Sequence, residues 1–171
     1  MSETAERLMD LAEAHIRNGG YAGFSFRDLA EEMGIKSASV HHHFPTKATM
    51  AVAVARRYGD RFLNAVAGQP EETVKDAIEA YRSAFRDALN RDGRMCLCGV
   101  LGAEAGVLSA EVAQEIHSFF QRCIEDLSRR IGGEHAEARA FHIMATLEGG
   151  MMLSRAYRDI EAFDQAVACL M

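Results

Sequence analysis

Apolar side chains recur along the chain at intervals of three and four residues, the spacing that gathers them on one face of an α-helix. Alternating runs of β-branched residues, which would indicate strands, do not occur. Glycines, prolines and capping residues divide the pattern into about nine segments. We expect helices at 4–18, 25–33, 38–44, 47–67, 71–89, 95–105, 110–131, 134–157 and 161–171. The pattern therefore predicts an all-α protein.

Two short helical segments follow each other within residues 24–47, FSFRDLAEEMGIKSASVHHHFPTK. Ser25 is a suitable N-cap for the first helix, because its hydroxyl can accept a hydrogen bond from a free backbone N–H group. Gly34 can end that helix in the left-handed conformation without a Cβ clash. We expect Ser37 to cap the second helix and Pro45 to end it. Two helices joined by so tight a turn predict a helix-turn-helix.

The second helix of this pair carries small and polar side chains where a packing helix would carry leucines. Val40 and Phe44 lie four residues apart and can face inward, which leaves most of 37–42 facing outward. Small hydroxyl groups and an alanine methyl group allow close approach to base edges in the major groove. No Asp or Glu occurs between Glu32 and Asp60. The basic residues inside this interval are Lys36, Lys47, Arg56 and Arg57. An acid-free interval favours contact with DNA phosphates.

The runs 24–30 (FSFRDLA) and 33–47 (MGIKSASVHHHFPTK) resemble the N-terminal DNA-binding domain of TetR-family transcriptional regulators. The capping serine, the glycine turn, the His-Phe pair and the following lysine stand at the family's spacing, although the family usually has aromatic residues where His41 and His42 stand. The resemblance implies a three-helix helix-turn-helix domain followed by a helical ligand-binding and dimerisation domain. We expect these domains at 1–47 and 68–171, with a connecting helix at 48–67.

The resemblance and the outward-facing positions together define an expected DNA interface. We expect residues 37–42, including Ser37, to enter the major groove of a double-stranded operator. The residues expected to approach base edges are Ala38, Ser39 and His42. The residues expected to contact phosphates are Ser25, Lys36, His41, Thr46 and Lys47. The function that follows is a DNA-binding regulator, most simply a dimeric repressor released by a small-molecule inducer or by thiol modification.

The net charge of −6 is unusual for a DNA-binding protein. Residues 1–62 hold 8 basic and 8 acidic side chains, whereas residues 63–171 hold 11 and 17. The excess acid therefore lies outside the expected DNA-binding part, and a local basic surface suffices for phosphate contact. No apolar run approaches the roughly 20 residues that a membrane span needs, and the first residues lack the pattern of a secretory signal. We therefore expect a cytoplasmic protein with no membrane partner.

The C-terminal helices carry an apolar face that is suited to a second copy of the chain. In TetR-like proteins the last two long helices pair with those of the other subunit, so the resemblance implies a homodimer. An ordinary core helix within one chain would show the same pattern. The face consists of Phe141, Ala145, Gly149, Met152 and Leu153, with Phe163, Val167 and Leu170 as its expected extension.

A ligand pocket for an unidentified inducer is expected among the helices of the C-terminal domain. Its candidate lining residues are Tyr81, Phe85, Met95, Phe119, Phe120, Phe141, Met144 and Met151. A mostly apolar cavity with a few polar groups is the usual form of such a site. For any one of these residues, an ordinary core position is the simpler interpretation. His117, His142 and Glu148 are candidate polar groups, but no spacing singles them out.

The four cysteines, Cys96, Cys98, Cys123 and Cys169, are most simply reduced and mostly buried. Alternatively, Cys96 opens a helix beside Arg94, a setting that favours the thiolate. The run Met95-Cys96-Leu97, with Leu101 and Ala103-Glu104 after it, also resembles one TetR subgroup. Some members of that subgroup sense electrophiles or oxidants through this cysteine. Cys96 is therefore a candidate thiol sensor.

Other functional classes have weaker support in the sequence. The side chains of His41, His42 and His43 point about 100° apart on a helix, so they cannot share a metal ion, and we expect no metal. No phosphate-binding loop or nucleophile elbow occurs, so we expect neither an enzyme nor a cofactor. Two alternatives stay open: a metal- or redox-responsive cysteine and histidine protein, and a helical protein-interaction module. Zinc content would favour the first, and absence of DNA affinity the second.

Overall fold

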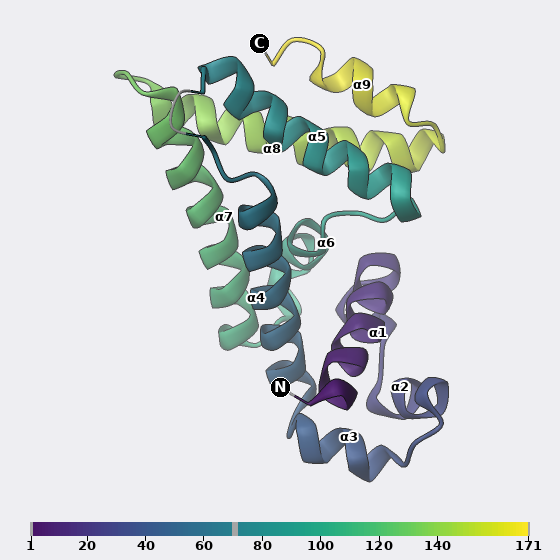
Figure 1. Ribbon diagram of the computed structural model, residues 1–171. Coiled ribbons are helices and arrows are strands. Elements are labelled where there is room, and N and C mark those ends of the chain that lie inside the picture. The colour runs from purple at the N-terminus through teal and green to yellow at the C-terminus, as the bar shows by residue number, and fades with distance from the viewer. Residues whose placement is uncertain (1, 70–71, 171) are drawn as a thin grey trace. The chain divides into compact units, whose positions relative to one another are not determined.

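The computed structural model describes residues 2–69 and 72–170 (Figure 1). Within them the chain forms helices and no β-strand, so the all-α prediction is confirmed. The long helices are α1 (Glu3–Gly19), α4 (Lys47–Ala65), α5 (Val74–Asp92), α7 (Ala110–Ile131) and α8 (Ala136–Tyr157). The short elements are α2 (Phe26–Met33), α3 (Ser37–His43), α6 (Leu97–Ala103), α9 (Glu161–Val167) and the 3-10 turns η1 (Tyr21–Gly23) and η2 (Ala105–Val107). None of the helices described is both long and apolar enough to span a bilayer.

These helices group into two compact units. The first unit holds the N-terminal residues up to Gly59 together with Leu97–Phe119. The second unit holds Asp60–Cys96 and the residues from Phe120 onward. Helices α4 and α7 each contribute residues to both units. The consecutive domain limits expected from the sequence stay a prediction.

Helix α1 provides much of the core of the first unit. Leu8 and Ile16 are fully buried on its inner face, and α1 packs against α2, η1 and α6. Arg57 of α4 fixes the polar side of α1, because its guanidinium group lies 2.9 Å from Glu6 Oε2 and 2.8 Å from Asp10 Oδ1. The helix that precedes the helix-turn-helix is therefore held by both apolar and ionic contacts.

In the second unit α8 packs against α5 and α9 (Figure 1). Gly150 permits the close approach of α9, because a Cβ atom at this position would lie 2.9 Å from Phe163 Cδ2. Phe163, Val167 and Leu170 are buried within their own chain. The expectation that these three extend a face for a second copy is wrong, because α9 folds back onto α8 and their side chains are buried within the same chain.

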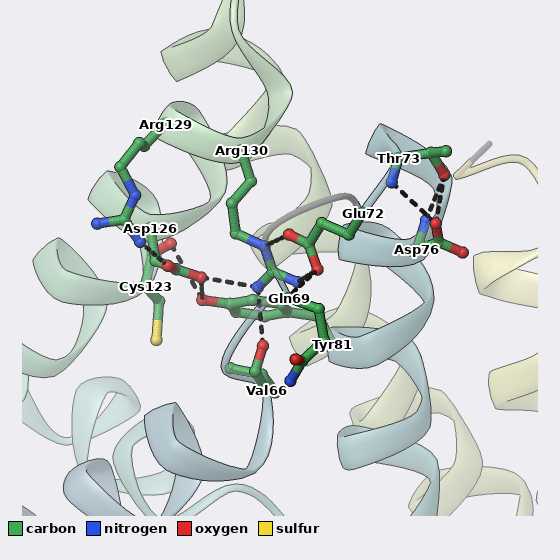
Figure 2. Close-up of polar contacts among 10 residues, drawn as sticks. All are labelled: Val66, Gln69, Glu72, Thr73, Asp76, Tyr81, Cys123, Asp126, Arg129 and Arg130. Atoms are coloured by element: carbon green, nitrogen blue, oxygen red, sulfur yellow. Dashed lines mark hydrogen bonds and ion pairs between the residues drawn. The ribbon is translucent and has the colours of Figure 1, made fainter.

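A mostly buried arginine joins the end of α4, the start of α5 and α7 (Figure 2). Arg130 binds the Glu72 carboxylate through Nε and Nη2, and its Nη1 donates to the Val66 carbonyl (2.8 Å) and to Asp126 Oδ2 (2.9 Å). Its guanidinium carbon lies 5.8 Å from the centre of the Tyr81 ring, whose hydroxyl donates to Asp126 (3.0 Å). The hydrogen bonds from Arg130 hold the pKa of Glu72 below its ordinary value, although burial opposes this. One guanidinium group thus donates hydrogen bonds to two carboxylates and a backbone carbonyl.

The start of α5 lies later than the predicted residue 71, because a capping box sets it at Val74. The N–H group of Asp76 donates to Thr73 Oγ1 (3.2 Å), and the N–H group of Thr73 donates to Asp76 Oδ2 (2.8 Å). Each side chain thus satisfies a backbone donor of the first turn. The helix begins at Val74. The predicted first residue, 71, lies outside the described residues.

Candidate DNA-binding surface and ligand site

Helices α2 and α3 form the helix-turn-helix, and the predicted N-cap and terminating glycine of α2 are confirmed. Ser25 Oγ accepts a hydrogen bond from the N–H group of Asp28 (3.2 Å) at the start of α2. Gly34 ends α2 with a φ of 66°, in the left-handed region where glycine is favoured. Just beyond it, the N–H group of Ile35 donates to the Ala30 carbonyl (2.9 Å) and closes the turn. The chain is thereby turned sharply into α3.

Of the next two helices, α3 lacks a side-chain N-cap and α4 has one. Ser37 is the first residue of α3, and Lys36 occupies the N-cap position without a side-chain capping bond. The prediction that Ser37 caps this helix is therefore wrong, because the helix begins one residue earlier. Thr46 does cap α4: its Oγ1 accepts from the N–H group of Thr49 (3.0 Å).

Helix α3 presents a small and polar face to solvent. Val40 is fully buried and anchors the helix, whereas the residues exposed on α3 are Ala38, Ser39, His41 and His42. The His41 ring packs against the Phe26 ring, with their centres 4.8 Å apart. Its Nδ1 lies 3.4 Å from the Pro45 carbonyl oxygen. The histidine thus packs against an aromatic ring at a position where TetR-family regulators usually have an aromatic residue.

Lys47, the first residue of α4, is held over two aromatic rings. Its Nζ lies 4.7 Å from the centre of the Tyr21 ring and 4.5 Å from that of Phe24, within the range of a cation–π interaction. Burial lowers the pKa of Lys47, although the charges of Glu104 and Asp28 partly offset the shift. Glu104 also accepts a hydrogen bond from the N–H group of Tyr21 (2.7 Å). The ammonium group is therefore held in place without DNA.

Two arginines of the acid-free interval are paired with acids from other helices. Arg56 Nη2 lies 2.7 Å from Glu115 Oε2 of α7, and Arg57 is bound to α1 as described above. The acid-free interval in the sequence had indicated that these two arginines face DNA phosphates. Because both are paired with acids, they do not contribute to a basic surface for DNA. Lys36 remains exposed beside α3.

Most of the expected pocket residues are buried in the second unit. They are Tyr81, Phe85, Met95, Met144 and Met151. Phe120 is half-buried, and Phe119 belongs to the first unit, where its ring lies 6.0 Å from that of Tyr58. Phe141 is 58% exposed, so its expected place in a pocket lining is wrong. On α8 it is exposed, whereas Met144 and Met151 are buried.

One side of α8 is apolar and uncovered in the single chain. Phe141 (58%), Met152 (62%), Leu153 (46%) and Tyr157 (74%) are largely exposed. A Cβ atom at Gly149 would meet nothing within 4 Å. Isolated exposed apolar residues are ordinary, but Phe141 and Met152 share a helix face with Ala145 and Gly149, and an apolar strip of this kind is typical of interaction sites.

Three of the four cysteines are buried, and Cys169 is exposed. Cys96 is only 1% exposed and precedes α6, which begins at Leu97. It therefore lies at the N-terminal end of α6, and its role as a thiol sensor stays a prediction. Burial raises the pKa of Cys123 to about 12, with the charges of Glu148 and Asp126 adding to the effect.

Glu148 of α8 is the polar residue that sequence patterns could not single out. Both of its carboxylate oxygens are buried, and neither has a hydrogen-bond partner among the residues described. Burial raises its pKa to about 7, and the nearby Cys96 thiol, a weak donor, offsets this only in part. Within 2–69 and 72–170, no three His, Cys, Asp or Glu side chains gather closely enough to hold a metal ion.

Two family profiles cover most of the chain. The profile described as "Bacterial regulatory proteins, tetR family" matches residues 8–54, which include α2 and α3. The profile described as "Transcriptional regulator LmrA/YxaF-like, C-terminal domain" matches residues 70–169, more than half of the 171 residues. The chain belongs to the TetR family. This TetR-family protein is a DNA-binding transcriptional regulator with a C-terminal ligand-binding domain, and members of its family are generally not enzymes.

Solved structures of TetR-family regulators superpose closely on this TetR-family protein. A regulator from Legionella pneumophila is 29% identical, with a TM-score of 0.92 over 99% of this chain and 96% of that one. A regulator from Agrobacterium tumefaciens is 25% identical, with a TM-score of 0.90 over 96% and 94%. E. coli NemR in its reduced form, at 22% identity and a TM-score of 0.83 over 99% and 95%, shares the fold. No curated protein sequence matches significantly.

Proposed function

We propose that this TetR-family protein is a homodimeric repressor that leaves its operator when a small-molecule inducer binds the C-terminal domain. The observation that carries the proposal is α3, a short helix anchored by the buried Val40 with an exposed face of small and polar residues. A helix with only a packing role would bury a stripe of several apolar residues and not a single one. A regulator of this kind acts in the cytoplasm, where the DNA is.

The chemistry of the helix-turn-helix supports a division between base reading and phosphate contact. Ala38 and Ser39 are small enough for close approach to base edges, and the exposed His42 can donate a hydrogen bond to an acceptor in the major groove. Ser37 lies beside them at the start of α3. The phosphate contacts are assigned to Ser25, Lys36, His41, Thr46 and Lys47. The aromatic support beneath Lys47 favours phosphate binding, because less side-chain entropy is lost.

A second copy of the chain is the partner that best fits the exposed side of α8. Phe141, Ala145, Gly149 and Met152 recur at helical spacing, and in a dimer this strip would be covered. The open space beside Gly149 would allow the facing helix to approach closely. A dimer also presents two reading helices to two half-sites, which raises affinity well above that of a single helix.

Inducer binding among the buried residues of the second unit would favour the conformation that does not fit the operator. A change at the Cys96 thiol is a second route to release. Its burial and the carboxylate beside it both disfavour the thiolate, so the ligand route has the better support. Operator release by oxidants that persists unchanged in Cys96→Ser would contradict thiol sensing.

Fluorescence anisotropy with labelled DNA from the region flanking the gene tests the DNA-binding assignment. In the dimer, Lys47→Ala should weaken binding and reduce the slope of log K against log salt by roughly 1.8, since each lost phosphate contact removes about 0.9. Lys75→Ala is the matched control, because it removes an exposed lysine from α5 and should change neither quantity. Equal affinity and slope in the wild type and Lys47→Ala would contradict the assignment.

A further inference from the structure

Glu148 is an acid without a partner in the interior of the second unit. The residue is partly exposed, but both carboxylate oxygens are buried. The Cys96 thiol, a weak donor, acts on the carboxylate, and no described group makes a well-formed hydrogen bond to either oxygen. Buried carboxylates in proteins are normally paired or hydrogen-bonded, because an ion in an apolar medium is strongly destabilised. In the same unit, the carboxylates of Asp126 and Glu72 are both paired with Arg130 (Figure 2). Glu148 is the exception that needs an explanation.

The surroundings of Glu148 are thiols and thioethers. The Cys96 thiol is the group that favours its ionised form, and Cys123 of α7 is close enough for its own pKa to be raised by the Glu148 charge. Met144 and Met151 lie one helical turn to either side on α8, and both are buried. No basic side chain contributes to the altered pKa of Glu148. The site therefore offers one negative charge in polarisable, apolar surroundings.

Chemistry limits what can supply the missing partner. An anionic ligand would be repelled, and a ligand with only hydrogen-bond acceptors could pair only with the protonated carboxyl group. A metal ion would need further ligands, and no group of three suitable side chains occurs among the described residues. An ammonium or amidinium group supplies both charge and N–H donors, and an apolar body would suit the neighbouring methionines.

We propose that Glu148 anchors a small organic cation, an ammonium or amidinium group on an apolar body, inside the C-terminal domain. The part of this inference that makes the cation the inducer rests on the function proposed above. The binding itself does not, because it can be measured without DNA. A buried carboxylate left unpaired in the free protein would be an example of stability given up for function.

Calorimetric titration of the full-length protein with three cations tests this site. The probes are butylammonium, benzamidinium and 2-phenylethylammonium, and the neutral counterparts are 1-butanol, benzamide and 2-phenylethanol. At least one cation should bind with a Kd of roughly 1 mM or tighter, and at least tenfold more tightly than its neutral counterpart. Near pH 7, binding should release about half a proton, because Glu148 is then about half protonated.

Glu148→Gln keeps the shape of the side chain and removes its charge, so it should abolish the tenfold preference for the cation. Glu137→Gln is the matched control, since Glu137 is exposed on the same helix, and it should keep the preference. Circular dichroism and sedimentation establish that both variants are folded like the wild type. Failure of all three cations to bind, no preference over the neutral counterparts, or a preference that survives in Glu148→Gln would overturn the inference.

Operator binding measured on the same preparations separates the two proposals. Cation preference that depends on Glu148, in a protein that binds no operator, would support this site and overturn the proposed repressor function. Operator binding by a protein that shows no preference for cations would support the proposed repressor function and overturn this site. Release of the operator by the cation in the wild type but not in Glu148→Gln would support both.

Discussion

The pH dependence of stability gives a quantitative test of the buried Glu148 carboxylate. Burial raises its pKa from 4.5 to about 7 in the folded chain. Because the folded-state pKa lies above the unfolded-state value, the folded protein holds this proton more tightly, and stability falls as pH rises through this interval. A pKa difference of one between the two states corresponds to about 1.36 kcal/mol. The ionised carboxylate should therefore cost about 3 kcal/mol at pH 8 but less than about 1 kcal/mol at pH 5.

Replacement of Glu148 by glutamine isolates this contribution. The amide does not titrate, so the wild type should lose about 2 to 3 kcal/mol of unfolding free energy relative to Glu148→Gln between pH 5 and pH 8. All other titrating groups are common to both proteins and cancel to first order. The Cys96 and Cys123 thiols both interact with the carboxylate, and Cys123, with a pKa of about 12, stays neutral in this range.

Urea denaturation followed by circular dichroism at several pH values, at one fixed subunit concentration, measures the difference. Glu137→Gln, at an exposed position of α8, should track the wild type at every pH. A wild type and a Glu148→Gln variant whose stabilities differ by a constant amount from pH 5 to pH 8 would refute the reasoning. The carboxylate would then titrate alike in the folded and unfolded chain.

Two further predictions concern the opposite sides of α8. Gly150→Ala should destabilise the subunit by about 1 to 3 kcal/mol in urea denaturation, since the new methyl group meets the Phe163 ring. Gly149→Ala, with open space beside it, should not destabilise the subunit, and equal losses in the two variants would contradict this difference. Met152→Asp should convert the dimer into monomers in sedimentation experiments and weaken operator binding at least tenfold, because it introduces a charge on the exposed apolar side. A Met152→Asp protein that remains dimeric would contradict the assignment of this side.

Local signals in the sequence predicted the structure correctly where a position requires one of only a few residue types. Gly34 and Ser25 were placed correctly because a left-handed turn and an N-cap each require few residue types. The start of α5 was misjudged although its signal was present. Thr73 and Asp76 have the spacing of a capping box, which sets the start of the helix at Val74 and not at the predicted residue 71.

The predictions failed where the sequence pattern shows that a helix face is buried but does not show which element covers it. Phe163 and Val167 have the periodicity of a packing face, and α9 folds back onto its own chain instead of onto a second copy. The pairing of Arg56 with Glu115 joins residues far apart in sequence, so an interval free of acids could not reveal it. Glu148 is a single acid in a helix, and only the packing of the second unit shows that its oxygens are buried.

The contacts of Arg130 bear on how the second unit exchanges its amide protons with solvent. Helix ends normally fray, because their last carbonyl groups have no partner. Just after the end of α4, the Val66 carbonyl instead accepts from Arg130, which also binds Glu72 before α5 and Asp126 in α7. Opening any one of these segments would break the contacts of the others. Their slowest amides should therefore exchange together, as one cooperative group and not helix by helix.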